Sequence, residues 1–303
     1  MKETDVPARL ASRGLLALIV AWCGAPPLMT WADTPPGANR FHEPVYRVAH
    51  NEPVAEPGTS AAAEASEPAA PAVHPLVPVL DYAKAGLAEI DAKIHDYSAT
   101  LVKRERLDGQ LSDYEYLFIK VRHQPFSIYM YALGPPAIKG RECLYVDGDN
   151  NGKLIAHEGS GFKAKLGTFR LDPNGLLAMR GQRYPITEVG IRNLAARLIE
   201  VGEQDTQYGE CEVKWYKDTK VDNRKCTCIQ VTHPVPRKEF RFHLAQVFID
   251  DELKVPIRYA SYQWPTTAGG PPLLDEEYTY LNIKTNNSFS DADFAERNPN
   301  YRF

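Results

Sequence analysis

The chain has 303 residues, of which 44% are hydrophobic and 24% charged, and its formal net charge is −4. This acidic balance argues against a nucleic-acid partner, because the neutralisation of phosphates needs a basic face. Beyond the first 32 residues no stretch has the length and apolarity of a membrane span, so the sequence predicts no transmembrane segment in the mature chain.

The N-terminus has the pattern of a secretory signal peptide. It starts with the basic residues Lys2, Arg9 and Arg13 and continues with an apolar run over residues 14–22 that is too short to span a bilayer. Thr30-Trp31-Ala32 then has the small–x–small form that a signal peptidase cleaves. We therefore expect a signal peptide over residues 1–32 and export to the periplasm or cell envelope.

Cys23 raises the question of a lipid anchor. A bacterial lipobox needs a small residue directly before the cysteine, and here Trp22 stands in that place. The sequence therefore favours a product that is soluble after cleavage near Ala32.

Residues 33–74 are predicted to be a disordered tether. They are rich in Pro, Ala and Glu, and residues 52–74 contain almost no large apolar side chains. Such a segment buries too little surface to offset the entropy of ordering it. One ordered domain is expected over residues 75–303.

This domain is predicted to be mainly β, of the α+β class. Apolar residues recur at helical spacing from Leu76 to Ile94, and Thr187 can cap a second helix that extends to Ile199. The rest alternates in strand-like runs separated by turns, which indicates one antiparallel sheet. The expected strands cover residues 97–107, 114–122, 126–133, 143–146, 154–157, 168–171, 211–216, 225–232, 239–249, 257–264 and 276–283.

The final third carries a resemblance to known proteins. Residues 248–259 form a strand, a turn and a strand beginning beside Pro256, and residues 274–284 and 289–294 follow as a last strand and a closing segment. This order resembles the end of the LolA/LolB-like periplasmic lipoprotein carriers. The resemblance implies a strongly curved, incomplete antiparallel barrel, covered by an N-terminal helix and one or two mid-chain helices, whose apolar concave face holds acyl chains.

A closer likeness is to DUF1571, an uncharacterised bacterial family with many members in planctomycetes. Residues 103–109, 152–158 and 298–301 look like further marks of that family. The match covers residues 76–303, which is the whole ordered part, and it implies no established activity.

Apolar and aromatic side chains share faces of several predicted strands. They are either ordinary core or the wall of a ligand cavity, and the family likeness alone favours the cavity. The candidate ligand-binding residues are Leu117, Ile119, Val121, Phe126, Ile128, Met130, Phe242, Leu244, Phe248, Tyr259, Tyr278 and Tyr280. The expected partner is an apolar small molecule or lipid, or a lipoprotein or envelope protein, and no cofactor is predicted.

A calcium loop is the alternative interpretation of one turn. Asp147, Asp149, Asn151 and Glu158 satisfy the spacing of an EF-hand loop. An EF-hand needs a helix on each side, whereas strand-like residues flank this loop, and a hairpin would carry Glu158 away from the turn. The sequence favours a plain hairpin without a metal.

The cysteines allow a disulfide in an oxidising compartment. Centring a hairpin on residues 218–223 brings Cys211 nearer to Cys228 than to Cys226, so a Cys211–Cys228 bridge is predicted. A zinc site formed by these three cysteines and His233 is conceivable, although its spacing matches no common structural site.

Catalysis is not indicated by any nucleophile motif. Glu276 and Glu277 alternate across a strand, so at most one of them faces inward. The favoured interpretation is that one is a surface charge and the other forms an ion pair with a residue such as Arg258 on the neighbouring strand. Three hypotheses remain: a carrier or sensor of an apolar ligand, a non-catalytic envelope scaffold with a filled core, and a secreted hydrolase. The hydrolase requires a cleft that converges on Glu276 or Glu277.

Overall fold

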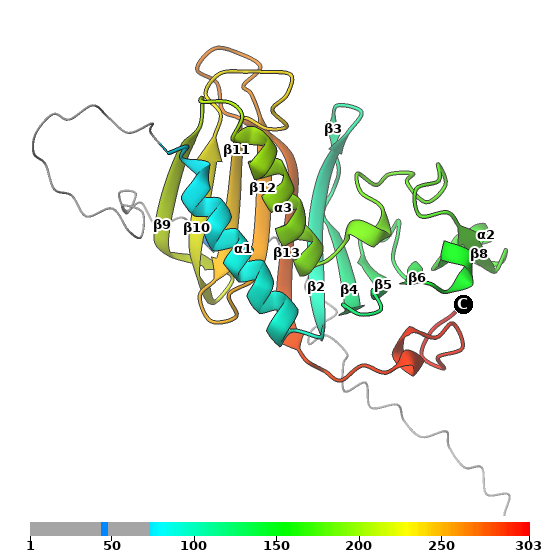
Figure 1. Ribbon diagram of the computed structural model, residues 1–303. Helices are drawn as coiled ribbons and strands as arrows, with labels where there is room; N and C mark the ends of the chain where they lie inside the picture. Colours follow the sequence, from blue (N-terminus) through cyan, green and yellow to red (C-terminus); the bar gives the residue numbers. More distant parts are fainter. Residues whose placement is uncertain (1–43, 48–72) are drawn as a thin grey trace, which may run out of the picture. The chain divides into compact units, whose positions relative to one another are not determined.

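The computed structural model describes residues 44–47 and 73–303 (Figure 1). The predicted signal peptide and most of the predicted tether lie outside the described residues. Within the described part, no helix is both long enough and apolar enough to cross a membrane.

One antiparallel sheet of thirteen strands forms the domain. Twelve strands follow a single path in the order β1-β9-β10-β11-β12-β13-β2-β4-β5-β6-β7-β8, and β3 pairs with β2 outside it. β1 and β8 stand at opposite ends of this path, so the sheet is open. The strands are β1 (Tyr46–Arg47), β2 (Asp96–Leu107), β3 (Gln110–Leu111), β4 (Glu115–Arg122), β5 (Ser127–Gly134), β6 (Glu142–Val146), β7 (Leu154–His157), β8 (Thr168–Leu171), β9 (Glu212–Val221), β10 (Arg224–Thr232), β11 (Leu244–Asp250), β12 (Pro256–Gln263) and β13 (Leu273–Thr285).

Two long helices, α1 (Leu76–Lys93) and α3 (Ile191–Asp205), lie side by side over one face of the sheet (Figure 1). A short helix, α2 (Gly161–Ala164), precedes β8. Leu76 and Leu80 of α1 and Ile199 of α3 pack into one apolar cluster with Trp215 of β9. The predicted fold class, an incomplete antiparallel sheet covered by an N-terminal and a mid-chain helix, is confirmed.

The mid-chain helix begins later than the sequence suggested. Ile186–Glu188 forms a separate 3-10 turn, and α3 starts only at Ile191. Between them Gly190 has a φ of 125°, which no residue within an α-helix adopts. The predicted cap at Thr187 is therefore wrong, because the chain turns at Gly190 before the helix begins.

Part of the predicted tether is paired with the sheet. Tyr46 and Arg47 form β1 and pair with Val221 and Lys220 of β9. The Tyr46 ring lies 3.9 Å from the guanidinium carbon of Arg258. Residues 44–47 are thus held by backbone pairing and by a cation–π contact, so this part of the predicted tether is ordered.

The C-terminal segment covers the opposite face of β5 and β6. Phe294, in the 3-10 turn Asp291–Phe294, packs with Leu144 and Tyr129. The ring of Tyr301 stacks on that of Tyr129 with centroids 3.8 Å apart. Since this face is closed by the chain's own end, the face beneath the helices is the one that remains to form a site.

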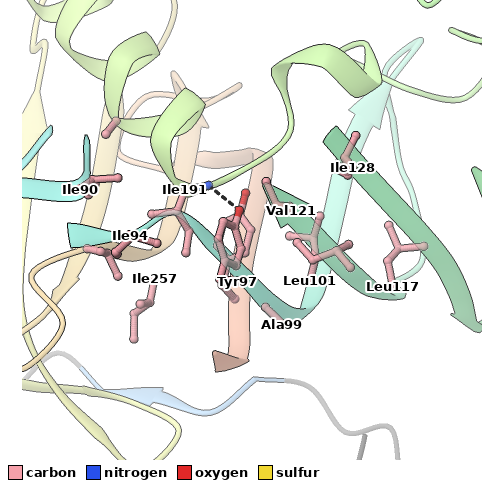
Figure 2. Packing of buried hydrophobic residues seen from close by; sticks show 14 of the residues in the cluster. Ile90, Ile94, Tyr97, Ala99, Leu101, Leu117, Val121, Ile128, Ile191 and Ile257 are labelled. Carbon is pink, nitrogen blue, oxygen red and sulfur yellow. Dashed lines mark hydrogen bonds between the residues drawn. The ribbon is translucent and has the colours of Figure 1, made fainter. Parts of the chain in front are cut away.

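Tyr97 of β2 joins the sheet to the start of α3 (Figure 2). Its side chain is fully buried, and its hydroxyl accepts a hydrogen bond of 2.9 Å from the backbone N–H of Ile191. A Cβ on Gly190 would lie 3.1 Å from that hydroxyl, so glycine also permits this close approach. The contact satisfies one of the free N–H groups in the first turn of α3.

We expect Tyr97→Phe to lower the free energy of unfolding by about 1–3 kcal/mol, because the buried N–H of Ile191 loses its acceptor. Urea unfolding followed by circular dichroism measures this difference. Tyr82→Phe is the matched control, since it keeps the edge-to-face contact with Trp215. Equal stability of Tyr97→Phe and the wild type would contradict this role of the hydroxyl.

Candidate functional site

A cavity of about 1130 Å³ lies between the sheet and the segments that cover it. One wall is the sheet face below the helices, and the other is formed by α3 together with residues 172–190, which connect β8 to α3 and are called here the covering segment. Apolar side chains make up much of the lining, including Leu101, Leu117, Met130, Leu154, Leu171, Leu177, Leu194, Leu198, Phe242 and Tyr280.

The sheet wall changes from apolar to polar along four neighbouring strands. Every second residue of a strand faces the cavity, as Leu101, Lys103 and Glu105 of β2 do. Strand pairing aligns Leu101 with Tyr280 of β13 and Leu117 of β4, which makes one apolar row.

Two residues further along β2, the side chains that face the cavity form a polar row. Lys103 pairs with Tyr278 and with Glu115. The next row joins Glu105 to Glu276 of β13 and continues to Ser261 of β12. The register therefore gathers the polar groups at one end of an otherwise apolar wall.

Lys103 lies between two carboxylates of this polar end. Its ammonium nitrogen is 3.2 Å from Glu105 and 3.5 Å from Glu115, and it donates a 2.7 Å hydrogen bond to Gln182. Gln182 belongs to the covering segment. The buried lysine thus fixes that segment to the sheet.

Glu276 is almost fully buried and has four polar partners. Arg183 approaches one of its oxygens at 3.0 Å, and Tyr184 donates to the other at 3.2 Å. The hydroxyls of Ser261 and Tyr278 lie at 3.3 and 3.2 Å. Burial raises the pKa of Glu276, although the Arg183 guanidinium opposes this shift.

Tyr278 stands between two carboxyl groups. Its hydroxyl is 2.6 Å from Glu105 and 3.2 Å from Glu276. A phenol has one proton to donate, so the two carboxyl groups compete for it, and the shorter contact is the one to Glu105. The pKa of Tyr278 is itself raised well above its usual value, by burial and then by Glu276 and Glu105, so the phenol stays neutral.

Six of the twelve predicted ligand-binding residues line the cavity. They are Leu117, Met130, Phe242, Tyr259, Tyr278 and Tyr280. Ile119, Val121 and Ile128 are fully buried instead, in the core cluster that includes Ile191. Figure 2 shows Val121 and Ile128 of this cluster. All three residues follow the same alternation, but they belong to the packed core cluster that also contains Ile191 of α3.

The other three predicted residues lie elsewhere. Phe126 packs against Tyr145, with ring centroids 6.2 Å apart. Phe248 packs on Tyr46 with centroids 6.0 Å apart, and Leu244 is half-buried at the start of β11 outside the cavity lining.

The predicted Cys211–Cys228 disulfide does not form. Cys228 pairs with Tyr216 in the β9–β10 hairpin, whereas Cys211 precedes β9. Both thiols are free, as are those of Cys143 and Cys226. The hairpin turn is centred on Asp222 and Asn223 rather than on the middle of residues 218–223, and this shift moves the two cysteines apart along the strands.

The loop that resembles an EF-hand is a turn between paired strands. Asn150 and Asn151 have φ angles of 51° and 55°, as a tight turn requires. Glu142 pairs with His157, so the following Glu158 lies at the far end of the hairpin and contacts Arg141 at 3.1 Å. In residues 44–47 and 73–303, no three acidic, histidine or cysteine side chains gather as metal ligands.

Glu276 and Glu277 face opposite sides of the sheet, as their alternation predicts. Glu277 pairs with the buried Arg258 at 2.5 Å, which agrees with the expected ion pair. Glu276 is not the expected surface charge, because it lies in the cavity wall.

Several polar residues of the site were not predicted. The alternation from Leu101 to Lys103 and Glu105 is visible in the sequence, and it indicates that an apolar strand face turns polar. No sequence pattern indicates the role of Arg183, because it lies in an irregular segment that approaches Glu276 and Asp275 only in the folded chain.

The family model described as "Protein of unknown function (DUF1571)" matches residues 94–303. The chain belongs to the DUF1571 family. This confirms the family predicted from the sequence, whereas no curated protein matches the chain.

Solved structures similar to this DUF1571 protein have low identity to it. A DUF1329 family protein from Desulfovibrio piger is 11% identical with a TM-score of 0.33, over 74% of this chain and 98% of the other. A putative outer membrane lipoprotein-sorting protein domain from Vibrio parahaemolyticus is also 11% identical, with a TM-score of 0.34 over 71% and 95%. A LolA superfamily protein from Nitrosomonas europaea is 11% identical, with a TM-score of 0.30 over 71% and 97%.

We expect the stability of Glu276→Gln relative to the wild type to increase as the pH rises. The raised pKa means that the folded state holds the Glu276 proton more tightly than the unfolded chain does. Proton binding to Glu276 therefore stabilises the folded wild type fully at pH values below the ordinary glutamate pKa. This stabilisation is lost as the pH rises through the raised pKa, whereas glutamine does not titrate.

Urea unfolding of both proteins from about pH 5 to about pH 8 measures this difference. The exposed Glu89, which pairs with Lys93 and has a lowered pKa, is the control. Its contribution to stability changes only below the ordinary glutamate pKa, so Glu89→Gln should keep a constant stability difference from the wild type over this range. A constant difference between Glu276→Gln and the wild type would contradict the raised pKa of Glu276.

Proposed function

We propose that this DUF1571 protein is an exported cell-envelope protein that binds an amphipathic ligand, with an acyl chain in the cavity. The observation that carries this proposal is the cavity wall itself, where an apolar row on β13, β2 and β4 leads into polar residues on the same strands and on β12. A ligand with an apolar chain and a polar end matches that wall in both parts.

The cavity has the size and lining that such a ligand needs. Its volume of about 1130 Å³ is slightly above the range of about 300–1000 Å³ typical of small-molecule sites. Burial of a methylene group contributes about 0.8 kcal/mol, so affinity should rise with chain length until the apolar part is filled.

The polar end supplies donors and acceptors for the ligand's head. Lys103, Gln182 and Tyr184 all face the cavity, as does Glu276. These groups already pair with one another, so they are held in place before a ligand arrives. Such preorganisation reduces the loss of side-chain freedom on binding.

The scaffold hypothesis fits the structure less well. A protein that acts only through its outer surface gains nothing from a large internal space, and a filled core would be more stable. The predicted signal peptide and tether over residues 1–74 serve either hypothesis, because both place the domain in the envelope. A lipid, a lipoprotein acyl group or another apolar molecule in that compartment is the expected partner.

Native mass spectrometry of the protein purified without detergent tests the proposal. We expect masses of co-purified ligands, and displacement of a fluorescent fatty acid by unlabelled long-chain fatty acids or alcohols. The absence both of bound ligand and of fluorescent fatty-acid binding would contradict it.

Met130→Asp should weaken binding of the fluorescent fatty acid at least about tenfold, because it places a carboxylate in the apolar wall. The matched control is Tyr131→Asp on the same strand, whose side chain packs with the C-terminal cluster on the opposite face. Fluorescence titration measures both, after circular dichroism has confirmed that each variant folds. Equal loss of affinity in the two variants would place the ligand elsewhere.

A second candidate is a hydrolase that uses Glu276 as a general acid. It is favoured by the raised pKa of a carboxyl group that faces a cavity, and by the hydroxyls of Ser261 and Tyr184 beside it. If this candidate is correct, Glu276→Gln should abolish turnover of acyl esters, while Glu115→Gln, in the same wall, should not. Absence of turnover by the wild type would eliminate this candidate and leave the binding proposal intact.

A further inference from the structure

Exposed apolar side chains gather where the cavity opens. Of the ten large apolar side chains that are exposed in the described residues, four lie within residues 166–177. We call Leu166, Phe169, Leu176 and Leu177 the apolar lip. Leu176 is 92% exposed and Leu177 is 73% exposed, although two adjacent leucines in water are unfavourable without a partner.

The apolar lip is continuous with the cavity. Leu166, Phe169 and Leu177 belong both to the lip and to the cavity lining. Their side chains thus join the solvent-exposed surface to the interior apolar wall. An acyl chain that leaves the cavity along this lip would stay in contact with apolar groups.

The charge of this region is opposite to that of the whole chain. Residues 159–183 contain five basic residues and one acidic residue, whereas the chain has a net charge of −4. Arg170 pairs with Glu296, and Arg183 pairs with Asp275 and Glu276.

Two of the basic residues remain available at the surface. Lys165 and Arg180 are exposed and form no ion pair with any residue that the structure describes. The one acidic residue of this region, Asp172, accepts a hydrogen bond from the backbone of Asn174. Exposed leucines beside unpaired cations match the surface of an anionic bilayer, which offers an apolar interior below a layer of negative charge.

We infer that the apolar lip docks the protein on an anionic lipid bilayer. Leu176 and Leu177 enter the boundary between head groups and acyl chains, while Lys165 and Arg180 contact the anionic head groups. Docking there places the cavity mouth against the membrane. The inference rests on the proposed function for its purpose, which is transfer of a ligand between the bilayer and the cavity.

Co-sedimentation of the purified protein with phosphatidylcholine vesicles, with and without phosphatidylglycerol, tests this inference. We expect the wild type to bind vesicles that contain phosphatidylglycerol. Leu176→Asp combined with Leu177→Asp should lower the partition coefficient at least about tenfold, because both leucines lose their insertion energy. Lys165→Gln and Arg180→Gln should each lower it about fivefold.

Val73→Asp is the matched control, because Val73 is 71% exposed and lies outside the lip. It should leave vesicle binding unchanged. A wild type that does not bind, or a double leucine variant that binds as tightly as the wild type, would overturn the inference. A leucine variant that changes the oligomeric state without affecting vesicle binding would assign the lip to a second copy of the chain instead.

The fluorescent fatty-acid titration separates this inference from the proposed function. Leu177 and Arg180 line the cavity, so cavity loading is compared only in Lys165→Gln and in Leu176→Asp alone, whose residues lie outside the lining. Both variants should load the cavity as the wild type does. Cavity loading without vesicle binding would reject docking alone. Vesicle binding without cavity loading would reject the proposed function alone.

Discussion

The backbone pairing between β2 and β13 is the constraint on which the site depends. It aligns Leu101 with Tyr280 and Glu105 with Glu276, so each row across the wall has one chemical character. A shift by one residue would turn these side chains to the other face and bring Arg258's partner, Glu277, into the cavity. The buried Arg258–Glu277 pair opposes that shift, because its separation would leave two uncompensated charges.

The cavity exists because each part of the sheet is covered differently. α1 and α3 fill the space over β9–β12, and the start of α3 packs on Tyr97 (Figures 1 and 2). Beyond that contact the covering segment crosses the sheet without a long helix of its own. It is held at its polar end by Lys103 and Arg183 rather than by apolar packing, and the space beneath it stays open.

The sequence predicted the sheet and both long helices, because alternation and helical spacing are local properties. The family was predicted separately, from the resemblance of short motifs. It also predicted that Leu117, Met130 and Tyr278 face inward. It could not separate them from Ile119 and Val121, which share the same alternation, because only the position of α3 decides which part of the face is covered. The polar end depends on strand register, and the disulfide prediction was wrong because the turn was centred incorrectly.

A crystal structure of the protein with a brominated long-chain fatty acid tests the central claim most directly. If the cavity binds an acyl chain, the anomalous signal of a bromine on the chain should lie between the sheet and α3, near Leu117 and Met130, with the polar head toward Glu276 and Tyr184. Bromine found only outside the cavity, or a cavity that stays empty at saturating ligand, would contradict the account.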